Sequence, residues 1–115
     1  MKTSQLTGAA LDWAVAKCEG VDIDKFFDAW VPDPVDPHFS KHFQPSTNWS
    51  QGGPIIEREK IGIGWEHNET ICVARVFTPP QGMWVVEGPT PLIAAMRCYV
   101  GFKLGDDIEI PEELK

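Results

Sequence analysis

The sequence predicts a small α+β domain in which helices pack on one face of an antiparallel sheet. Three observations indicate this class: an apolar helical repeat near each end of the chain, β-branched runs between them, and a proline-rich stretch after the first helix. At 115 residues the chain suits a single domain over 1–115. The expected order is an N-terminal helix, a long proline-rich loop, three to four antiparallel strands, and a C-terminal helix packed on the sheet.

The first predicted helix covers residues 8–19, because Thr7 is a suitable N-cap and Gly20 a suitable stop. Its apolar residues recur at helical spacing and should face the core: Leu11, Ala14, Val15 and Cys18. A short second helical turn is expected over 23–30. The prolines that follow disfavour regular structure, so we expect an ordered loop over 31–54.

Strands are expected where β-branched and other apolar residues gather, at 55–61, 63–66, 70–77 and 83–87. Turns should connect them at 67–69 and 79–82, where polar residues, proline and glycine interrupt the apolar runs. The last helix should begin with Thr90 as its cap and Pro91 as its first residue, and it should end at Gly105.

The net charge of −7 is unevenly distributed along the chain. Residues 1–40 carry three lysines and seven carboxylates, and residues 106–115 carry one lysine and five carboxylates. No basic stripe can be drawn, so duplex nucleic acid is not an expected partner. No apolar run approaches the ~18 residues of a membrane span and no apolar leader is present, so we expect a cytoplasmic protein without membrane contact. Three widely spaced cysteines fit a reducing compartment.

The loop before the predicted strands holds the residues best suited to ligand binding. It combines an indole for stacking on a flat ring, amides for reading the edges of that ring, and two adjacent glycines whose backbone can approach an anion. The alternative is structural: the indole fills the core and the polar side chains cap turns. The candidate contacts are Asn48, Trp49, Gln51, Gly52 and Gly53.

Two residues of the last helix extend this candidate site. Thr90 and the free amides after it form an anion site if the loop folds over them. Arg97 stands in the middle of a helix that is apolar nearly all round, so its charge needs a partner. That partner is either a carboxylate such as Glu57 or Glu59, which is the commoner case, or a phosphate or carboxylate of a ligand.

Sequence signals for catalysis, cofactors and metals are missing. The chain has no Gly-x-Ser-x-Gly elbow, phosphate loop, dinucleotide fingerprint or paired-cysteine motif. We therefore expect a non-enzymatic protein without a cofactor or a metal. Five tryptophans and six phenylalanines are many for this length, and some of them are expected at a homo-oligomer interface.

Longer motifs stand near both ends of the chain and in the loop: LDWAVA at 11–16, PSTNW at 45–49, QGGPIIERE at 51–59, GPTPLIAAMRCYV at 88–100 and KLGD at 103–106. These motifs resemble the NinX-like family of small phage proteins. The resemblance implies a phage or prophage accessory protein, which would act in the host bacterial cell. It implies no catalytic residues, because the family carries no established activity to transfer.

The leading hypothesis is a non-enzymatic phage accessory protein that binds and sequesters a small polar, nucleotide-like ligand, as in blunting a host defence signal. Trp49 would stack, Asn48 and Gln51 would read edges, and the remaining contacts would hold an anion: Gly52, Gly53, Thr90 and Arg97. The alternative is an acidic protein–protein inhibitor of a host protein, motivated by the negative flanks. A third hypothesis, a small enzyme acting on nucleotides, needs an acid–base pair that the sequence does not identify.

Overall fold

The computed structural model describes residues 1–20, 30–32, 40–66, 68, 70–78 and 82–114. It confirms the α+β class: helices α1 (Gly8–Glu19), α2 (Trp49–Glu59) and α3 (Pro91–Leu104) accompany an antiparallel sheet of β3 (Gly62–Glu66), β4 (Ile71–Thr78) and β5 (Gly82–Gly88). A separate pair of strands is formed by β1 (Trp30–Pro32) and β2 (Ser40–His42). Short 3₁₀ turns, η1 (Thr3–Gln5) and η3 (Glu112–Leu114), lie near the two ends.

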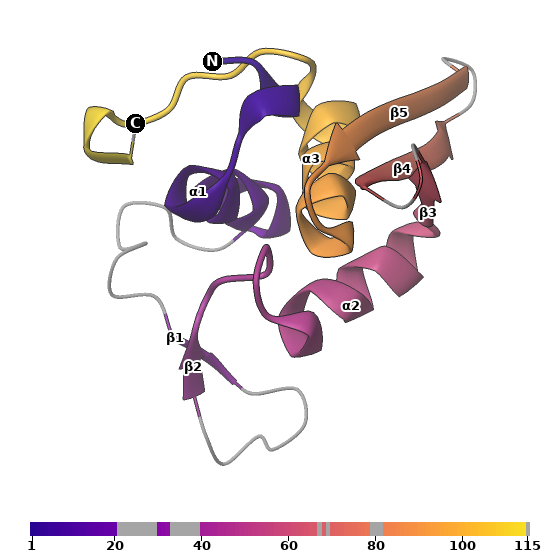
Figure 1. Cartoon of the computed structure of the whole chain (residues 1–115). Coiled ribbons are helices and arrows are strands. Elements are labelled where there is room, and N and C mark those ends of the chain that lie inside the picture. The colour runs from indigo at the N-terminus through magenta and orange to yellow at the C-terminus, as the bar shows by residue number, and fades with distance from the viewer. Residues whose placement is uncertain (21–29, 33–39, 67, 69, 79–81, 115) are drawn as a thin grey trace.

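Helix α3 is the centre of the molecule. The sheet lies on one side of it, α1 lies on the other, and α2 lies below (Figure 1). Because α3 is covered from several directions, its side chains are buried nearly all round: Leu92, Ala94, Ala95, Met96, Cys98, Tyr99 and Val100. The predicted packing of the last helix on the sheet is therefore confirmed.

The ends of α1 and α3 follow the residues that predicted them. Gly20 ends α1 in the left-handed conformation, with φ of 78°. Thr90 caps α3 by accepting a hydrogen bond from the Ile93 N–H at 3.1 Å, and Gly105 ends that helix. Thr7 occupies the N-cap position of α1, but its side chain accepts no capping hydrogen bond.

One face of the β3–β4–β5 sheet packs on α3. Alternate residues of the central strand point to this inner face and are buried: Cys72, Ala74 and Val76. Gly101 of α3 fits directly against the indole of Trp84 on β5, where a Cβ atom would collide with the ring. The glycine therefore sets how closely the helix approaches the sheet.

Residues 55–61 were predicted as a strand, and that prediction is wrong, because most of them belong to α2. Asn48 caps this helix and Lys60 ends it in a left-handed conformation, with φ of 57°. Its buried residues recur at helical spacing: Gln51, Gly52 and Ile55. The packing of this stripe outweighs the poor helix propensity of its glycines and of Pro54.

The predicted loop over 31–54 is shorter than expected. β1 and β2 pair antiparallel within it, with Pro32 opposite Ser40. Pro32 stands at the end of its short strand, where the missing N–H costs little. Of the expected helical turn over 23–30, all but its last residue lies outside the described residues, and that residue, Trp30, begins β1.

A cluster of polar side chains ties the three helices together. Arg58 of α2 donates from Nη1 and Nη2 to the two carboxylate oxygens of Glu19 at the end of α1, at 3.0 and 2.6 Å. The same Nη2 donates to the hydroxyl of Tyr99 on α3 at 3.1 Å, and that hydroxyl donates to Glu19. The Nε of Arg58 donates to Glu59 at 2.8 Å. We call these four residues the Arg58 clasp.

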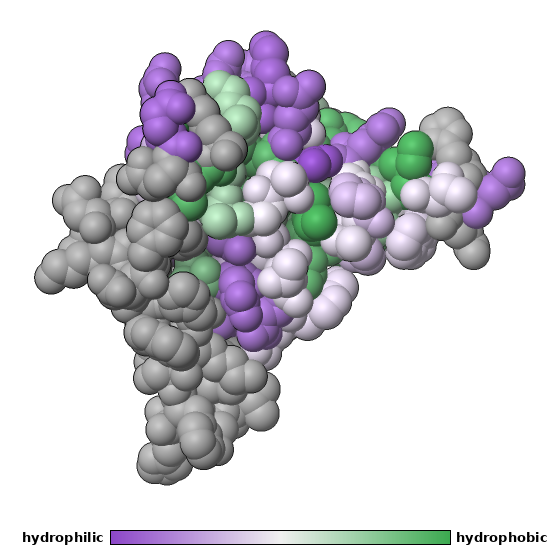
Figure 2. All heavy atoms as spheres, turned by 60° about the vertical axis from the view of Figure 1, so that its left-hand side comes forward, coloured by the Kyte–Doolittle hydropathy of each residue, from purple (hydrophilic) through white to green (hydrophobic). Residues whose placement is uncertain are grey.

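The two ends of the chain lie together (Figure 1). Lys2 and Asp107 form an antiparallel bridge, and the N-terminal ammonium is 2.9 Å from the Asp107 carboxylate. The acidic tail therefore runs beside the first residues, and its own Ile110 is buried. Hydrophilic residues gather over this upper part of the molecule (Figure 2). Among the described residues, no helix has the length and apolar character needed to cross a membrane.

Candidate functional site

The beginnings of α2 and α3 meet at a hollow of about 240 Å³, which we call the Trp49 hollow. Trp49 is 55% exposed, so its indole does not fill the core as the structural alternative required. The first turn of α3 forms the other wall, and its N-terminal amides favour negative charge. The lining residues are Ser46, Thr47, Trp49, Thr90, Pro91, Leu92 and Ile93.

The side chains of Asn48 and Gln51 are used by the fold itself. The Asn48 carboxamide oxygen accepts from the Ser50 N–H at 2.9 Å and from the Ser50 hydroxyl at 2.5 Å, which caps α2. The Gln51 oxygen accepts from the Gln44 N–H at 2.7 Å, and Gln51 is buried. Neither residue lines the Trp49 hollow, so both fit the structural alternative better than edge recognition.

The two adjacent glycines of α2 have different surroundings. A Cβ on Gly52 would lie 2.5 Å from both the Pro45 carbonyl oxygen and Cδ2 of Leu92. Gly52 is therefore a packing residue between α2 and α3, and its N–H donates to the Asn48 carbonyl oxygen at 2.9 Å. Gly53 has only the Trp49 ring as a neighbour, at 4.0 Å from the position of a Cβ.

Ser46 is a buried member of the Trp49 hollow that the sequence did not single out. Its N–H donates to the Asp12 carboxylate of α1 at 2.8 Å. Burial raises the pKa of Asp12, and this hydrogen bond together with the nearby Ser46 side chain opposes part of that rise. The Ser46 hydroxyl itself has no hydrogen-bond partner among the described residues. The one sequence signal for this contact is Asp12 itself, because it stands between the apolar residues Leu11 and Trp13.

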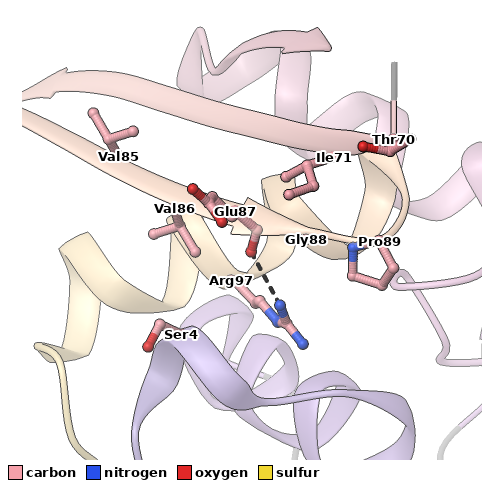
Figure 3. Close-up of a pocket in the computed structure, with 9 residues that line it drawn as sticks. All are labelled: Ser4, Thr70, Ile71, Val85, Val86, Glu87, Gly88, Pro89 and Arg97. Carbon is pink, nitrogen blue, oxygen red and sulfur yellow. Dashed lines mark hydrogen bonds between the residues drawn. The ribbon is translucent and has the colours of Figure 1, made fainter. Parts of the chain in front are cut away.

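Arg97 borders a second hollow, of about 670 Å³, which we call the Arg97 hollow (Figure 3). Its guanidinium lies between the end of β5 and the segment that contains Ser4 (Figure 3). The side chain of Glu87 points away from it, whereas the Glu87 carbonyl oxygen faces it (Figure 3). The lining residues are Ser4, Thr70, Ile71, Val85, Val86, Glu87, Gly88, Pro89 and Arg97.

Backbone carbonyl groups hold Arg97 in place. Its Nε donates to the Leu6 oxygen at 2.6 Å, and its Nη1 donates to the Glu87 oxygen at 3.0 Å. The expected ion pair with Glu57 or Glu59 is wrong, because Glu59 is paired with Arg58 and Lys103 and neither carboxylate contacts Arg97. Burial lowers the pKa of Arg97, but an arginine remains charged at neutral pH.

The two hollows are neighbours on one side of α3. Pro89 lines the Arg97 hollow and the next residue, Thr90, lines the Trp49 hollow. Ile93 and Arg97 are four residues apart on α3, so they are adjacent on the helix surface although each lines a different hollow. The structure thus brings Trp49, Thr90 and Arg97 to one side of the molecule and uses Asn48, Gln51 and Gly52 elsewhere.

The fold defines a small α+β domain with two hollows beside α3. The model of the family described as Bacteriophage P22, NinX, matches residues 2–103. The chain therefore belongs to this phage protein family, as the motifs in its sequence indicated. A search among curated proteins gave no match.

Proposed function

We propose that this protein binds a small polar, nucleotide-like ligand without transforming it, and so withholds that ligand from host defence signalling. The observation that carries the proposal is the set of contacts made by the Arg97 guanidinium. Two neutral carbonyl groups orient its guanidinium, and no carboxylate among the described residues neutralises it. A charge that is oriented but not neutralised is available to an anion.

The chemistry of arginine supports a phosphate or carboxylate at this position. A guanidinium carries five N–H donors in a planar fork, and the two carbonyl contacts leave several of them unused. Those donors can bind two oxygens of one anion side by side. Partial burial strengthens this contact, because the surroundings screen the charges less than water does.

The Trp49 hollow supplies a complementary contact. An exposed indole beside a helix N-terminus can stack on a flat ring while the first-turn amides face a polar group. Thr90 and Arg97 are seven residues apart on α3, or about 10 Å along the helix axis. A ring and a phosphate joined by a sugar can cover that distance.

Binding is better supported than catalysis by the residues at hand. Glu87 and Arg97 are the only titratable residues lining the two hollows in the described part of the chain. Because the Glu87 side chain points away from Arg97, these two do not form an acid–base pair (Figure 3). The larger hollow, of about 670 Å³, has the size of a small-ligand site.

Native mass spectrometry of protein purified from phage-infected cells is the first test, followed by denaturation to release any bound small molecule. Calorimetric titration with mononucleotides and cyclic dinucleotides then compares the wild type with Arg97→Gln and Trp49→Ala. Each variant should bind at least about tenfold more weakly. Arg75→Gln and Trp65→Ala are matched controls, because both residues lie outside the two hollows. Unchanged affinity in Arg97→Gln and Trp49→Ala would overturn the proposal.

The acidic tail favours a second candidate function, inhibition of a basic host protein. Its carboxylates are exposed on one end of the molecule: Asp106, Asp107, Glu109 and Glu112. Such a surface should capture a basic partner at low salt and release it at high salt. Pull-down from host lysate with wild type and with Glu109→Lys tests this, since the variant should retain less partner while the ligand site stays intact.

A further inference from the structure

No described helix lies on the outer face of the β3–β4–β5 sheet, because α3 and α1 both lie on the inner side (Figure 1), although Val73 at the centre of that face is buried. Three large apolar side chains are exposed on it: Phe77 (65%), Met83 (58%) and Val85 (55%). Phe77 and Met83 are directly opposite each other, and Val85 follows two residues along β5 on the same face. A contiguous apolar group of this kind typically marks an interface.

The same face has a hollow beside these three apolar side chains. Gly62 and Gly64 of β3 have no side chains there, which leaves a hollow of about 380 Å³ bounded by Glu66 and Arg75. The strand register places Gly62 in line with Val85, and Gly64 in line with Glu87. Val85 on β5 and the hollow at Gly62 on β3 therefore stand at matching positions on opposite edges of one sheet, whereas Phe77 lies on the central strand.

We propose that a second copy of this chain covers the outer face. A two-fold axis running along β4 puts β5 of each copy over β3 of the other, so that each Val85 fills the space above a Gly62. The same rotation brings Glu87 of one copy to Gly64 of the other, close to that copy's Arg75. Val85 then meets the hollow of the other copy twice, and the two Phe77 side chains of the central strands face each other across the axis.

The charges of the face favour a second copy over an anionic occupant. It carries one arginine, Arg75, and two glutamates, Glu66 and Glu87. Nucleic acid or an anionic membrane would need a basic surface, whereas a face of mixed sign can pair with itself. Arg75 already contacts its own Glu66 at 3.4 Å, and Glu87 has no ion-pair partner among the described residues. A second copy supplies that partner.

The decisive variant is Gly64→Glu. No atom lies within 4 Å of a Cβ at Gly64, so the monomer has room for the side chain, but it would fill the hollow that receives the other copy. The matched control is Gly53→Glu, which makes the same change in charge on α2, where a Cβ would meet only the Trp49 ring at 4.0 Å. Urea unfolding checks that both variants fold.

Sedimentation velocity over a wide range of protein concentrations should show a dimer for wild type and for Gly53→Glu. The dissociation constant of Gly64→Glu should be at least about tenfold higher. Arg75→Glu and Glu87→Arg should each weaken the dimer, and the double variant should restore it. A wild type that stays monomeric throughout, or a Gly64→Glu dimer as tight as wild type, would overturn the proposal.

This inference is independent of the proposed ligand, although Val85 and Glu87 also border the Arg97 hollow. Gly64 lines neither ligand hollow. Its variant should therefore bind nucleotide like the wild type while losing the dimer, and Arg97→Gln should do the reverse.

Discussion

Arg58 and Arg97 lie on helices that pack against each other, yet the fold uses them in opposite ways. Hydrogen bonds to the carboxylates of Glu19 and Glu59 raise the pKa of Arg58 above its ordinary value. Arg97 contacts carbonyl oxygens instead, and burial lowers its pKa. Among the described residues, the first charge is paired with carboxylates, whereas the second contacts only neutral carbonyl groups.

A structural charge thus differs from one that is available to a ligand by its partners. An ion pair whose donors and acceptors are satisfied contributes to the fold, whereas a fixed charge without a counter-ion retains its capacity to bind one. The adjacent glycines of α2 repeat this contrast. Gly52 is in contact with Pro45 and Leu92, whereas Gly53 has space around it.

The largest expected effect is that of Gly52→Ala. Its Cβ would lie 2.5 Å from a backbone oxygen, which cannot move away cheaply, so the free energy of unfolding should fall by about 3 kcal/mol. Gly53→Ala has no such conflict and should raise that free energy by about 0.5 kcal/mol, because alanine favours a helix. Urea unfolding of the two variants measures both changes. Equal effects would show that the glycines do not differ as the structure describes.

The next effect in size concerns the Arg58 clasp. Glu19→Gln removes the carboxylate that accepts from Arg58 and from the buried Tyr99 hydroxyl, and should lower the free energy of unfolding by about 2 kcal/mol. Glu66→Gln is the control, because its ion pair with Arg75 is exposed and should contribute less than about 0.5 kcal/mol. Ligand affinity should stay unchanged in both variants, since neither residue lines a ligand hollow.

A smaller stability effect is expected from Arg97→Lys. One ammonium group cannot reach the Leu6 and Glu87 oxygens as the planar guanidinium does, so the free energy of unfolding should fall by about 1 kcal/mol. The retained charge should preserve part of the nucleotide affinity that Arg97→Gln loses. Arg58→Lys should cost stability without any loss of affinity, and calorimetric titration separates the two arginines.

The sequence predicted those elements whose ends are marked by local chemistry. Thr90, Pro91 and Gly105 bound α3 correctly, and the β-branched runs located the three strands of the sheet. α2 was missed because its first turns hold two glycines and a proline, and their helical conformation depends on packing such as the contact of Gly52 with Pro45 and Leu92. Such a contact joins distant segments and leaves no local pattern.

The candidate site was predicted in part. The predicted site required the Trp49 segment to approach Thr90, and both residues do line the Trp49 hollow. The partners of Arg97 were not predicted, because one of them is the backbone oxygen of Leu6, which is 91 residues away and common to every residue type. Asn48 has a cap role that its position before α2 would have indicated had the helix been recognised.

The changes of stability with pH are the smallest effects, and those of the two carboxyl groups of α1 should have opposite signs. Burial raises the pKa of Glu19, but hydrogen bonds from Arg58 and Tyr99 outweigh it and leave that pKa below its ordinary value. Its contribution to stability is therefore present above the unfolded-state pKa and is lost as the pH falls through the folded-state pKa. Burial raises the pKa of Asp12, so its contribution is present at low pH and is lost as the pH rises through the folded-state pKa.

Urea unfolding between acidic and neutral pH should reveal this opposition. The stability advantage of wild type over Glu19→Gln should shrink as the pH falls, because protonation breaks the clasp in the wild type alone. Asp12→Asn keeps an oxygen for the Ser46 N–H and avoids burying a charge, so it should gain on wild type as the pH rises. If the advantage of wild type over Glu19→Gln did not shrink as the pH falls, Glu19 would not be ion-paired with Arg58, and the contrast between Arg58 and Arg97 would lose its basis.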